Sequence, residues 1–275
     1  MSIGKYILVN GSFISTDEYR ISISESEAFL FSEKIRSVRT VFPFFKETLE
    51  IIKLQLRIFG HSFPDFTSND GAGLKRQLER TLTKNKHFMG AFFTVSFRFN
   101  EQKVQYTIHS EKLENTTYEL NEKGLYVELF DEIQKSASSI SMFSIGSRNY
   151  WNIAKNQLTN PMIDHFLITN TENHIIEIPE SSIYIIKDKL VRGVSSKHGA
   201  YQDISKPLML NIFAKSGLNY SEDDGISVRD LRESEEIMAV NAIDGIRWIV
   251  GFEGKRFFSN TIRKISEEFN QKIIS

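Results

Sequence analysis

Cysteine is absent from the 275 residues, which excludes disulfide bonds, thiolate metal ligands and cysteine nucleophiles. No apolar run approaches the roughly 20 residues that a transmembrane helix needs. The charges nearly cancel, with 34 Lys and Arg against 35 Asp and Glu, so bulk electrostatics favour neither nucleic acid nor a membrane as partner. The first residues, Met1 to Lys5, lead into a strand pattern and not into the apolar core of a signal peptide. We therefore expect a cytoplasmic protein.

Motifs for several common chemistries are also missing. The six histidines show no metal-ligand spacing such as HExxH, and no metal is expected. His165 and His174 lie on adjacent predicted strands and could be neighbours, but packing or surface roles are the simpler interpretation. No G-x-S-x-G segment is present for a serine hydrolase. The basic residues of the helix predicted over 74–84 are interpreted as a solvated face: Arg76, Arg80 and Lys84.

What the chain does contain is a core and a regular alternation of elements. Its composition is 40% hydrophobic with 22 phenylalanines, and its length suits two domains. Hydrophobic periodicity and turn signals predict both hairpins and helices. The predicted hairpin strands are 6–9 with 12–14, 92–97 with 104–108, and 182–186 with 190–191. The predicted helices are 43–60, 74–84, 148–158, 203–217 and 257–269. The polar segment Glu111 to Thr117 is the best candidate for a linker.

Two segments carry a resemblance to a known family. Ala28 to Val41 is similar, position for position, to the "AF.yGD.lFEtiRv" stretch of class IV aminotransferases. Ser234 to Trp248 looks like the "ADEvFltNAi.GirWv" segment of the same family. That family uses pyridoxal phosphate (PLP) and includes branched-chain aminotransferases and aminodeoxychorismate lyase.

The resemblance implies an α+β, two-domain architecture, PLP fold type IV. We expect a small N-terminal α/β sandwich over 1–112, a linker over 113–120, and a larger C-terminal pseudo-barrel α/β domain over 121–275. The cofactor cleft would lie between the two domains. Family members are dimers, so a homodimer, or a heterodimer with an active relative, is implied.

The positions that would hold PLP have changed. Laid over the family pattern, Ser144 falls where the family keeps the lysine that holds PLP as a Schiff base, and a hydroxyl cannot form an imine. Ile51 replaces an arginine that grips the phosphate. Asp203 replaces the glycine of a phosphate-binding helix start, where a carboxylate would repel the anion. Val240 stands where a phosphate-binding Ser or Thr is common.

Three cleft positions keep polar side chains. Glu177 falls where the family keeps the glutamate that pairs with the ring nitrogen, although a glutamate at a strand end is more often simply solvated. Lys206 keeps the charge of the family's arginine without its bidentate fork. Asn241 belongs to the second matching segment. We therefore expect a degenerate, aminodeoxychorismate lyase-like pseudoenzyme, without a PLP Schiff base, that acts as a non-catalytic binding or partner protein.

Two alternatives stay open. The chain could be an active PLP aminotransferase or lyase whose amine comes from Lys135 or Lys155. The cleft could instead be repurposed for another small molecule, with polar contacts from Arg148, Glu177, Lys206 and Arg247. The loop at 197–199 could also meet an anion.

Overall fold

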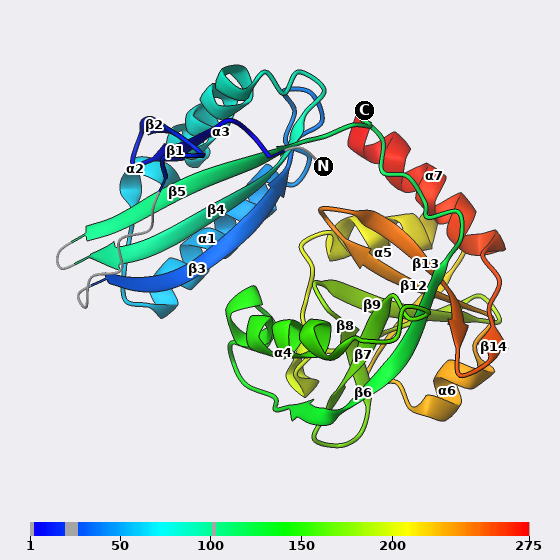
Figure 1. Cartoon of the computed structure of the whole chain (residues 1–275). Helices are drawn as coiled ribbons and strands as arrows, with labels where there is room; N and C mark the ends of the chain where they lie inside the picture. Colours follow the sequence, from blue (N-terminus) through cyan, green and yellow to red (C-terminus); the bar gives the residue numbers. More distant parts are fainter. Residues whose placement is uncertain (1–2, 20–26, 101–102, 275) are drawn as a thin grey trace. The chain divides into compact units, whose positions relative to one another are not determined.

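The chain separates into two compact units, residues 1–117 and residues 118–275. The structure is a computed structural model that describes residues 3–19, 27–100 and 103–274. Each unit has its own sheet and its own helices (Figure 1). The boundary between the units falls inside the segment 113–120, where the linker was expected.

The first unit is built on a five-stranded antiparallel sheet in the order β2-β1-β5-β4-β3. Its strands are β1 (Tyr6–Val9), β2 (Ser12–Ser15), β3 (Glu27–Arg36), β4 (Ala91–Asn100) and β5 (Lys103–Lys112). The turn between β1 and β2 places Asn10 and Gly11 at positive φ, as a tight hairpin turn requires. Burial alternates along β4, where Phe93, Val95 and Phe97 are buried and their neighbours are not. One face of the sheet is therefore the core face.

Helices supply the other layer of the first unit. They are α1 (Phe45–Ile58), α2 (Pro64–Thr67), the 3₁₀ turn η1 (Asn69–Gly71) and α3 (Ala72–Asn85). Helix α1 packs on β3, and α3 packs on β1 and β5. The basic face predicted on α3 is exposed, but two of its cations also lie over aromatic rings of the first hairpin. The Nζ of Lys84 is 4.2 Å from the centre of the Tyr6 ring, and the Arg80 guanidinium is 5.3 Å from that of Phe13.

The second unit contains a larger mixed sheet whose central strands close into a barrel. The strand order is β11-β10-β9-β12-β13-β6-β7-β8, and β8 also pairs with β9, which closes six strands into a ring. The strands are β6 (Leu125–Lys135), β7 (His165–Asn170), β8 (Ile175–Ile178), β9 (Ser181–Lys187), β10 (Leu190–Val194), β11 (Asn219–Asp223), β12 (Glu236–Asn241), β13 (Gly245–Phe252) and β14 (Lys255–Arg256). Every residue of β8 and β12 is buried, as expected of strands covered on both faces.

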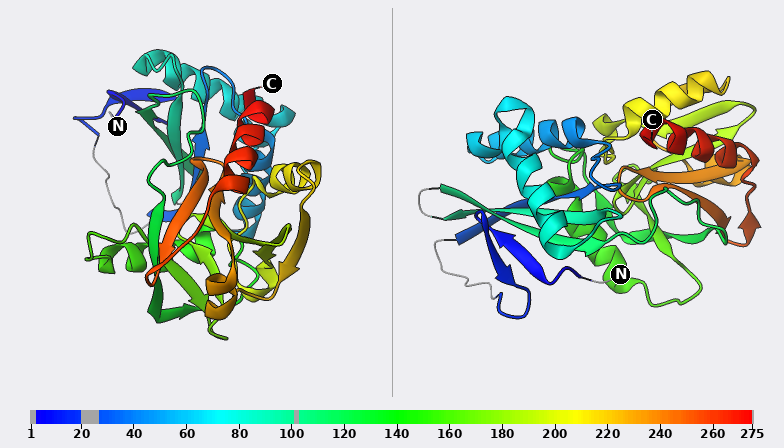
Figure 2. Two further views of the ribbon diagram at one scale, coloured as in Figure 1. Left: turned by 90° about the vertical axis from the view of Figure 1, so that its right-hand side faces the viewer. Right: turned by 90° about the horizontal axis from the view of Figure 1, so that it is seen from above.

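The helices of the second unit cover the barrel. They are α4 (Ser144–Gln157), the 3₁₀ turn η2 (Ser196–His198), α5 (Lys206–Lys215), α6 (Val228–Glu233) and α7 (Asn260–Ile274). Helix α7 packs against β12 and β13, with α5 beside it (Figure 2). Helix α4 packs on β6 and β7. No helix in the described part of the chain is long and apolar enough to cross a membrane.

The α+β class with two units is confirmed, and several element bounds differ from those predicted. Strand β5 runs through Lys112, so the first two residues of the expected linker, from Glu111, belong to the sheet. Helix α4 begins at Ser144, four residues before the predicted start at Arg148. The turn expected between β4 and β5 lies at residues 101–102, outside the described residues.

Candidate functional site

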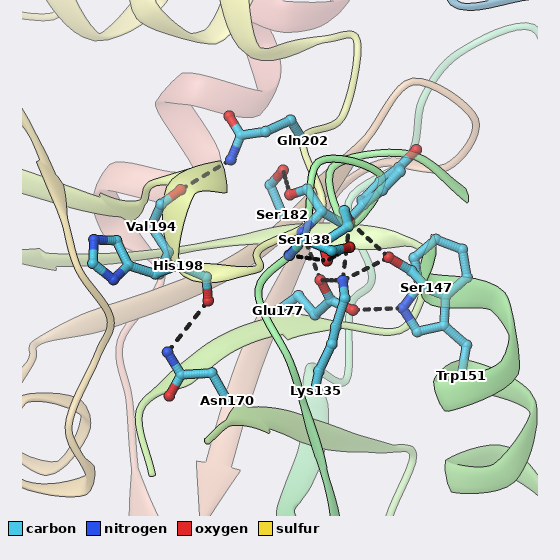
Figure 3. Close-up of polar contacts among 12 residues, drawn as sticks. Lys135, Ser138, Ser147, Trp151, Asn170, Glu177, Ser182, Val194, His198 and Gln202 are labelled. Carbon is cyan, nitrogen blue, oxygen red and sulfur yellow. Dashed lines mark hydrogen bonds and ion pairs between the residues drawn. The ribbon is translucent and has the colours of Figure 1, made fainter. Parts of the chain in front are cut away.

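A fully buried ion pair joins the end of strand β6 to strand β8 in the second unit. The Lys135 ammonium donates a hydrogen bond to Oε2 of Glu177 at 2.7 Å, and both side chains have no exposed surface. The same ammonium also donates to Oγ of Ser147 at 2.6 Å and to the carbonyl oxygen of Ser141 at 3.1 Å. Figure 3 shows these contacts converging on the lysine nitrogen. An ammonium has three protons, and each of them has an acceptor here.

An irregularity in strand β6 directs Lys135 inward. Phe130 pairs with Ile168 of β7, and the next recorded pair joins Lys135 to Asn170. Between the two pairs β6 advances five residues while β7 advances two, so residues 131–134 form a bulge. Three of those four residues are exposed, whereas Phe130 and Lys135 on either side are buried. A bulge re-aims the side chain that follows it, which explains a lysine pointing into the core at the end of a polar run.

The carboxylate of Glu177 is held by two further donors. Nε1 of Trp151 donates to Oε1 at 2.8 Å, and the backbone N–H of Tyr201 donates to Oε2 at 2.6 Å. Trp151 and Ser147 are four residues apart on α4, which places both on the helix face directed toward the barrel. The rings of Trp151 and Tyr201 meet edge to face, with centroids 5.0 Å apart. Glu177 is therefore fixed by neutral donors as well as by the lysine.

Burial sets the electrostatics of this pair. Removal from water lowers the pKa of Lys135, and the opposite charge and hydrogen bond of Glu177 partly offset that effect. A buried pair of this kind is stable only when the remaining protons and lone pairs are matched. Ser147 contributes to that matching, because its hydroxyl also donates to the Ser141 carbonyl oxygen at 3.0 Å. The arrangement is a closed hydrogen-bonded network around one positive and one negative charge.

A second buried charge lies at the start of helix α5. Oδ1 of Asp203 accepts hydrogen bonds from the backbone N–H of Ser205 at 2.8 Å and from its hydroxyl at 2.5 Å. The Tyr201 hydroxyl reaches Oδ2 at 3.4 Å, so Tyr201 contacts both Asp203 and Glu177. Burial raises the pKa of Asp203 to about 6, and its hydrogen bonds oppose that rise. The Asp203 carboxylate therefore accepts hydrogen bonds from the main chain and from a hydroxyl at the start of α5.

The neighbouring cation is already paired. Nζ of Lys206 donates to Oε1 of Glu222 and to Oε1 of Gln202, each at 2.5 Å. Lys206 lines a small pocket together with residues of β8, β9, β10, β11 and the loop before α5: Ile176, Ser182, Ile183, Tyr184, Val194, Tyr201, Gln202 and Tyr220. Within the described part of the chain, the buried hydroxyl of Tyr220 has no hydrogen-bond partner. The pocket lies next to Asp203 in the chain, because Tyr201 and Gln202 are among its lining residues.

The other residues predicted for a cofactor site lie at separate positions in the fold. Ser144 is buried as the first residue of α4, and Val240 is buried within β12. Asn241 shapes the turn after β12, where its Oδ1 accepts from the backbone of Asp244 at 2.6 Å and its Nδ2 donates to Ser181 at 2.9 Å. Ile51 is half-buried on α1 and belongs to the first unit.

The structure tests the alternatives that the sequence left open for Glu177, the two candidate lysines and the two histidines. Glu177 is fully buried, so its interpretation as a solvated strand-end residue is wrong. Lys155 lies exposed on α4, whereas Lys135 contacts Glu177 directly. His165 and His174 lie at opposite ends of the β7–β8 hairpin and are not neighbours.

Two further residues proposed as ligand contacts, Arg247 and His198, have partners close to them in the structure. Arg247 faces Asp244, with their nearest polar atoms 3.9 Å apart, and the loop residue His198 pairs with Asp224 at 2.9 Å. In the described ranges no three His, Asp or Glu side chains are grouped to hold a metal.

Sequence reasoning did not identify Ser147, Trp151 or Tyr201 as part of the site. The spacing of Ser147 and Trp151 on one helix face was a usable signal, because both lie on the side of α4 that is buried. The backbone contact of Tyr201 left no such signal, since a main-chain N–H belongs to every residue type except proline.

The fold matches solved structures, although no family model and no curated protein match the chain. A branched-chain aminotransferase from Thermoproteus uzoniensis, solved with norvaline, superposes with a TM-score of 0.81 at 15% identity, over 98% of this chain and 95% of that one. The branched-chain amino acid aminotransferase of Escherichia coli gives 0.80 at 12% identity, over 97% and 93%. A putative 4-amino-4-deoxychorismate lyase from Legionella pneumophila gives 0.77 at 14% identity, over 93% and 97%. The chain therefore has the fold of the class IV aminotransferases.

Proposed function

We propose that this chain is a non-catalytic protein with the class IV aminotransferase fold, a pseudoenzyme that acts as a binding or partner protein and does not hold PLP. The observation that carries the proposal is the buried contact between Lys135 and Glu177. Glu177 stands where the resemblance places the partner of the PLP ring nitrogen. In this chain an internal ammonium already occupies that carboxylate.

The geometry of the pair does not fit the cofactor. The imine carbon and the ring nitrogen of PLP lie at opposite ends of one pyridine ring, so the ring must stand between the amine and the carboxylate that hold it. The Lys135 ammonium and the Glu177 carboxylate are 2.7 Å apart, which leaves no space for a ring between them. Trp151 and the Tyr201 backbone take further acceptor sites on the same carboxylate.

The phosphate end does not fit either. A phosphate would meet the carboxylate of Asp203 at the start of α5, and two anions in a buried place repel each other strongly. Lys206, the nearest replacement for the family's arginine, is neutralised by Glu222. These contacts support a site in which Glu177 and Lys206 already have partners of opposite charge within the chain.

A role through a partner follows from the same proposal. The resemblance implies a dimer, so we propose a homodimer or a heterodimer with an active relative of the same fold. Sedimentation of the purified chain alone, and after mixing with a class IV aminotransferase of the same source, tests this part. A strictly monomeric chain in both experiments would contradict it.

The second candidate function is an active PLP enzyme with a displaced lysine, and one observation favours it. Lys135 is an amine placed directly beside Glu177, whereas Lys155 is exposed. For Lys135 to serve as the anchor, the buried pair would first have to separate and the lysine leave its three acceptors. That separation is costly because it leaves two unpaired buried charges.

Titration with PLP decides between the two candidates. We expect no visible absorption band that borohydride removes, and no borohydride-stabilised adduct on Lys135 by peptide mass mapping. The E. coli branched-chain aminotransferase, stripped of ligand, is the positive control. The Lys135→Met variant serves as the matched control for adducts on surface lysines. A stoichiometric adduct on Lys135 in the wild-type chain, absent from Lys135→Met, would overturn the proposal in favour of the displaced-lysine enzyme.

A further inference from the structure

We infer that the Lys135 amine is an internal ligand of a preformed ammonium-binding subsite, and that this subsite takes up a small primary alkylammonium ion when the amine is removed. The inference rests on the proposed function, because it treats the amine as permanently engaged and not as a catalytic nucleophile. It goes further by assigning a ligand chemistry to the groups around Glu177.

The acceptors of the subsite are held in place without the lysine. Trp151 and the Tyr201 backbone fix the Glu177 carboxylate from α4 and from the loop before α5. The Ser147 hydroxyl is oriented by its own hydrogen bond to the Ser141 carbonyl oxygen. Removing the amine therefore leaves one carboxylate oxygen, one hydroxyl and one carbonyl oxygen arranged around the vacated nitrogen position. Preorganised groups bind a ligand without a further ordering cost.

The chemistry of these groups selects the ligand. Three acceptors match the three N–H donors of a primary ammonium, and the negative charge of Glu177 demands a cation. The lysine stem that leads to this point is fully buried, so the vacated space also accepts an alkyl chain. A hydrated metal ion has no alkyl chain, and a quaternary ammonium ion has no N–H donor. A linear primary alkylammonium satisfies both requirements.

The removal of one charge provides the driving force for binding. An unpaired carboxylate in the interior is strongly unfavourable, so a variant without the amine is destabilised and gains most from a replacement cation. Truncation to alanine leaves room for the last three carbons of the stem and the nitrogen, which corresponds to n-propylammonium. Loss of the pair is expected to lower the Tm of the second unit by about 10 °C.

The experiment is a chemical rescue of the Lys135→Ala variant, with PLP absent throughout. Thermal unfolding is followed at rising concentrations of n-propylammonium chloride against sodium chloride of equal ionic strength. We expect a saturable recovery of at least half of the lost Tm, with a smaller recovery from methylammonium and none from tetramethylammonium. The Tm of the wild-type chain and of the exposed-site control Lys155→Ala should not rise with n-propylammonium. The double variant Lys135→Ala/Glu177→Gln should lose the effect, since its subsite has no charge.

Each outcome of the rescue experiment either supports or overturns the inference. No recovery with any primary ammonium, or equal recovery with tetramethylammonium, overturns the inference. If Lys135→Ala does not fold alone, its refolding yield in propylammonium replaces Tm as the readout, and an unchanged yield overturns the inference equally. A PLP adduct on Lys135 of the wild-type chain defeats the proposed function by a separate measurement. Rescue by propylammonium with no such adduct supports both.

Discussion

The buried pair should behave as one energetic unit, and a double-mutant cycle on Lys135 and Glu177 measures this directly. The perturbations are Lys135→Met, which keeps the apolar stem, Glu177→Gln, which keeps the shape, and the two together. Each single change leaves one buried charge without its partner. Breaking a buried pair in this way costs about 3–5 kcal/mol of unfolding free energy.

The double variant should cost much less than the sum of the two single changes. With both charges removed, the penalty of an unpaired buried ion disappears, and what remains is the imperfect matching of the Trp151 and Tyr201 donors to an amide. Additive single costs would total about 6–10 kcal/mol, which approaches the whole stability of an ordinary domain. We expect the double variant to cost about 1–3 kcal/mol, which corresponds to a coupling energy of at least about 3 kcal/mol between the two positions.

Urea unfolding followed by tryptophan fluorescence is the appropriate assay. The chain contains 2 tryptophans, Trp151 and Trp248, and both lie in the second unit, so the signal reports that unit and not the first. Lys155→Met is the matched control, because Lys155 is exposed on α4 and its loss should change stability by less than about 0.5 kcal/mol. If the effects of Lys135→Met and Glu177→Gln add to within about 0.5 kcal/mol, the reasoning about the pair is refuted.

Three further predictions concern the same network. Because burial raises the pKa of Asp203 to about 6 from 3.8, the folded chain binds an extra proton between about pH 4 and pH 6, and this group's contribution to stability falls as pH rises through that window. Asp203→Asn should remove that dependence, so its unfolding free energy relative to wild type should increase by about 2 kcal/mol from pH 4 to pH 7; urea titrations showing a constant difference would contradict this. Trp151→Phe should cost about 1–3 kcal/mol through the lost donor to Glu177, and an unchanged urea midpoint would argue against that hydrogen bond. Ser144→Lys should still give no borohydride-stable PLP adduct at position 144 by mass mapping, because Glu177 and Asp203 remain engaged.

Local patterns in the sequence were sufficient for much of the secondary structure. Asn10-Gly11 predicted the first hairpin, and the spacing of Leu49, Ile52 and Leu56 predicted α1, because turn chemistry and helical periodicity act over a few residues. The two segments matching class IV aminotransferases indicated the fold, and the solved structures confirm it. The sequence alone also shows a serine at position 144, where the resemblance places the Schiff-base lysine.

The tertiary structure alone decided what Lys135 and Glu177 do. Lysine in the polar run before Ser136 resembles a surface residue, and glutamate at the end of a strand resembles a solvated one. The contacts that make them a buried pair span 42 residues between Lys135 and Glu177, 26 between Trp151 and Glu177, and 24 between Tyr201 and Glu177. A periodic pattern records only which side of its own element is apolar. Whether two charges meet in the core depends on a bulge in β6 and on the closure of the barrel, and neither is a local property of the chain.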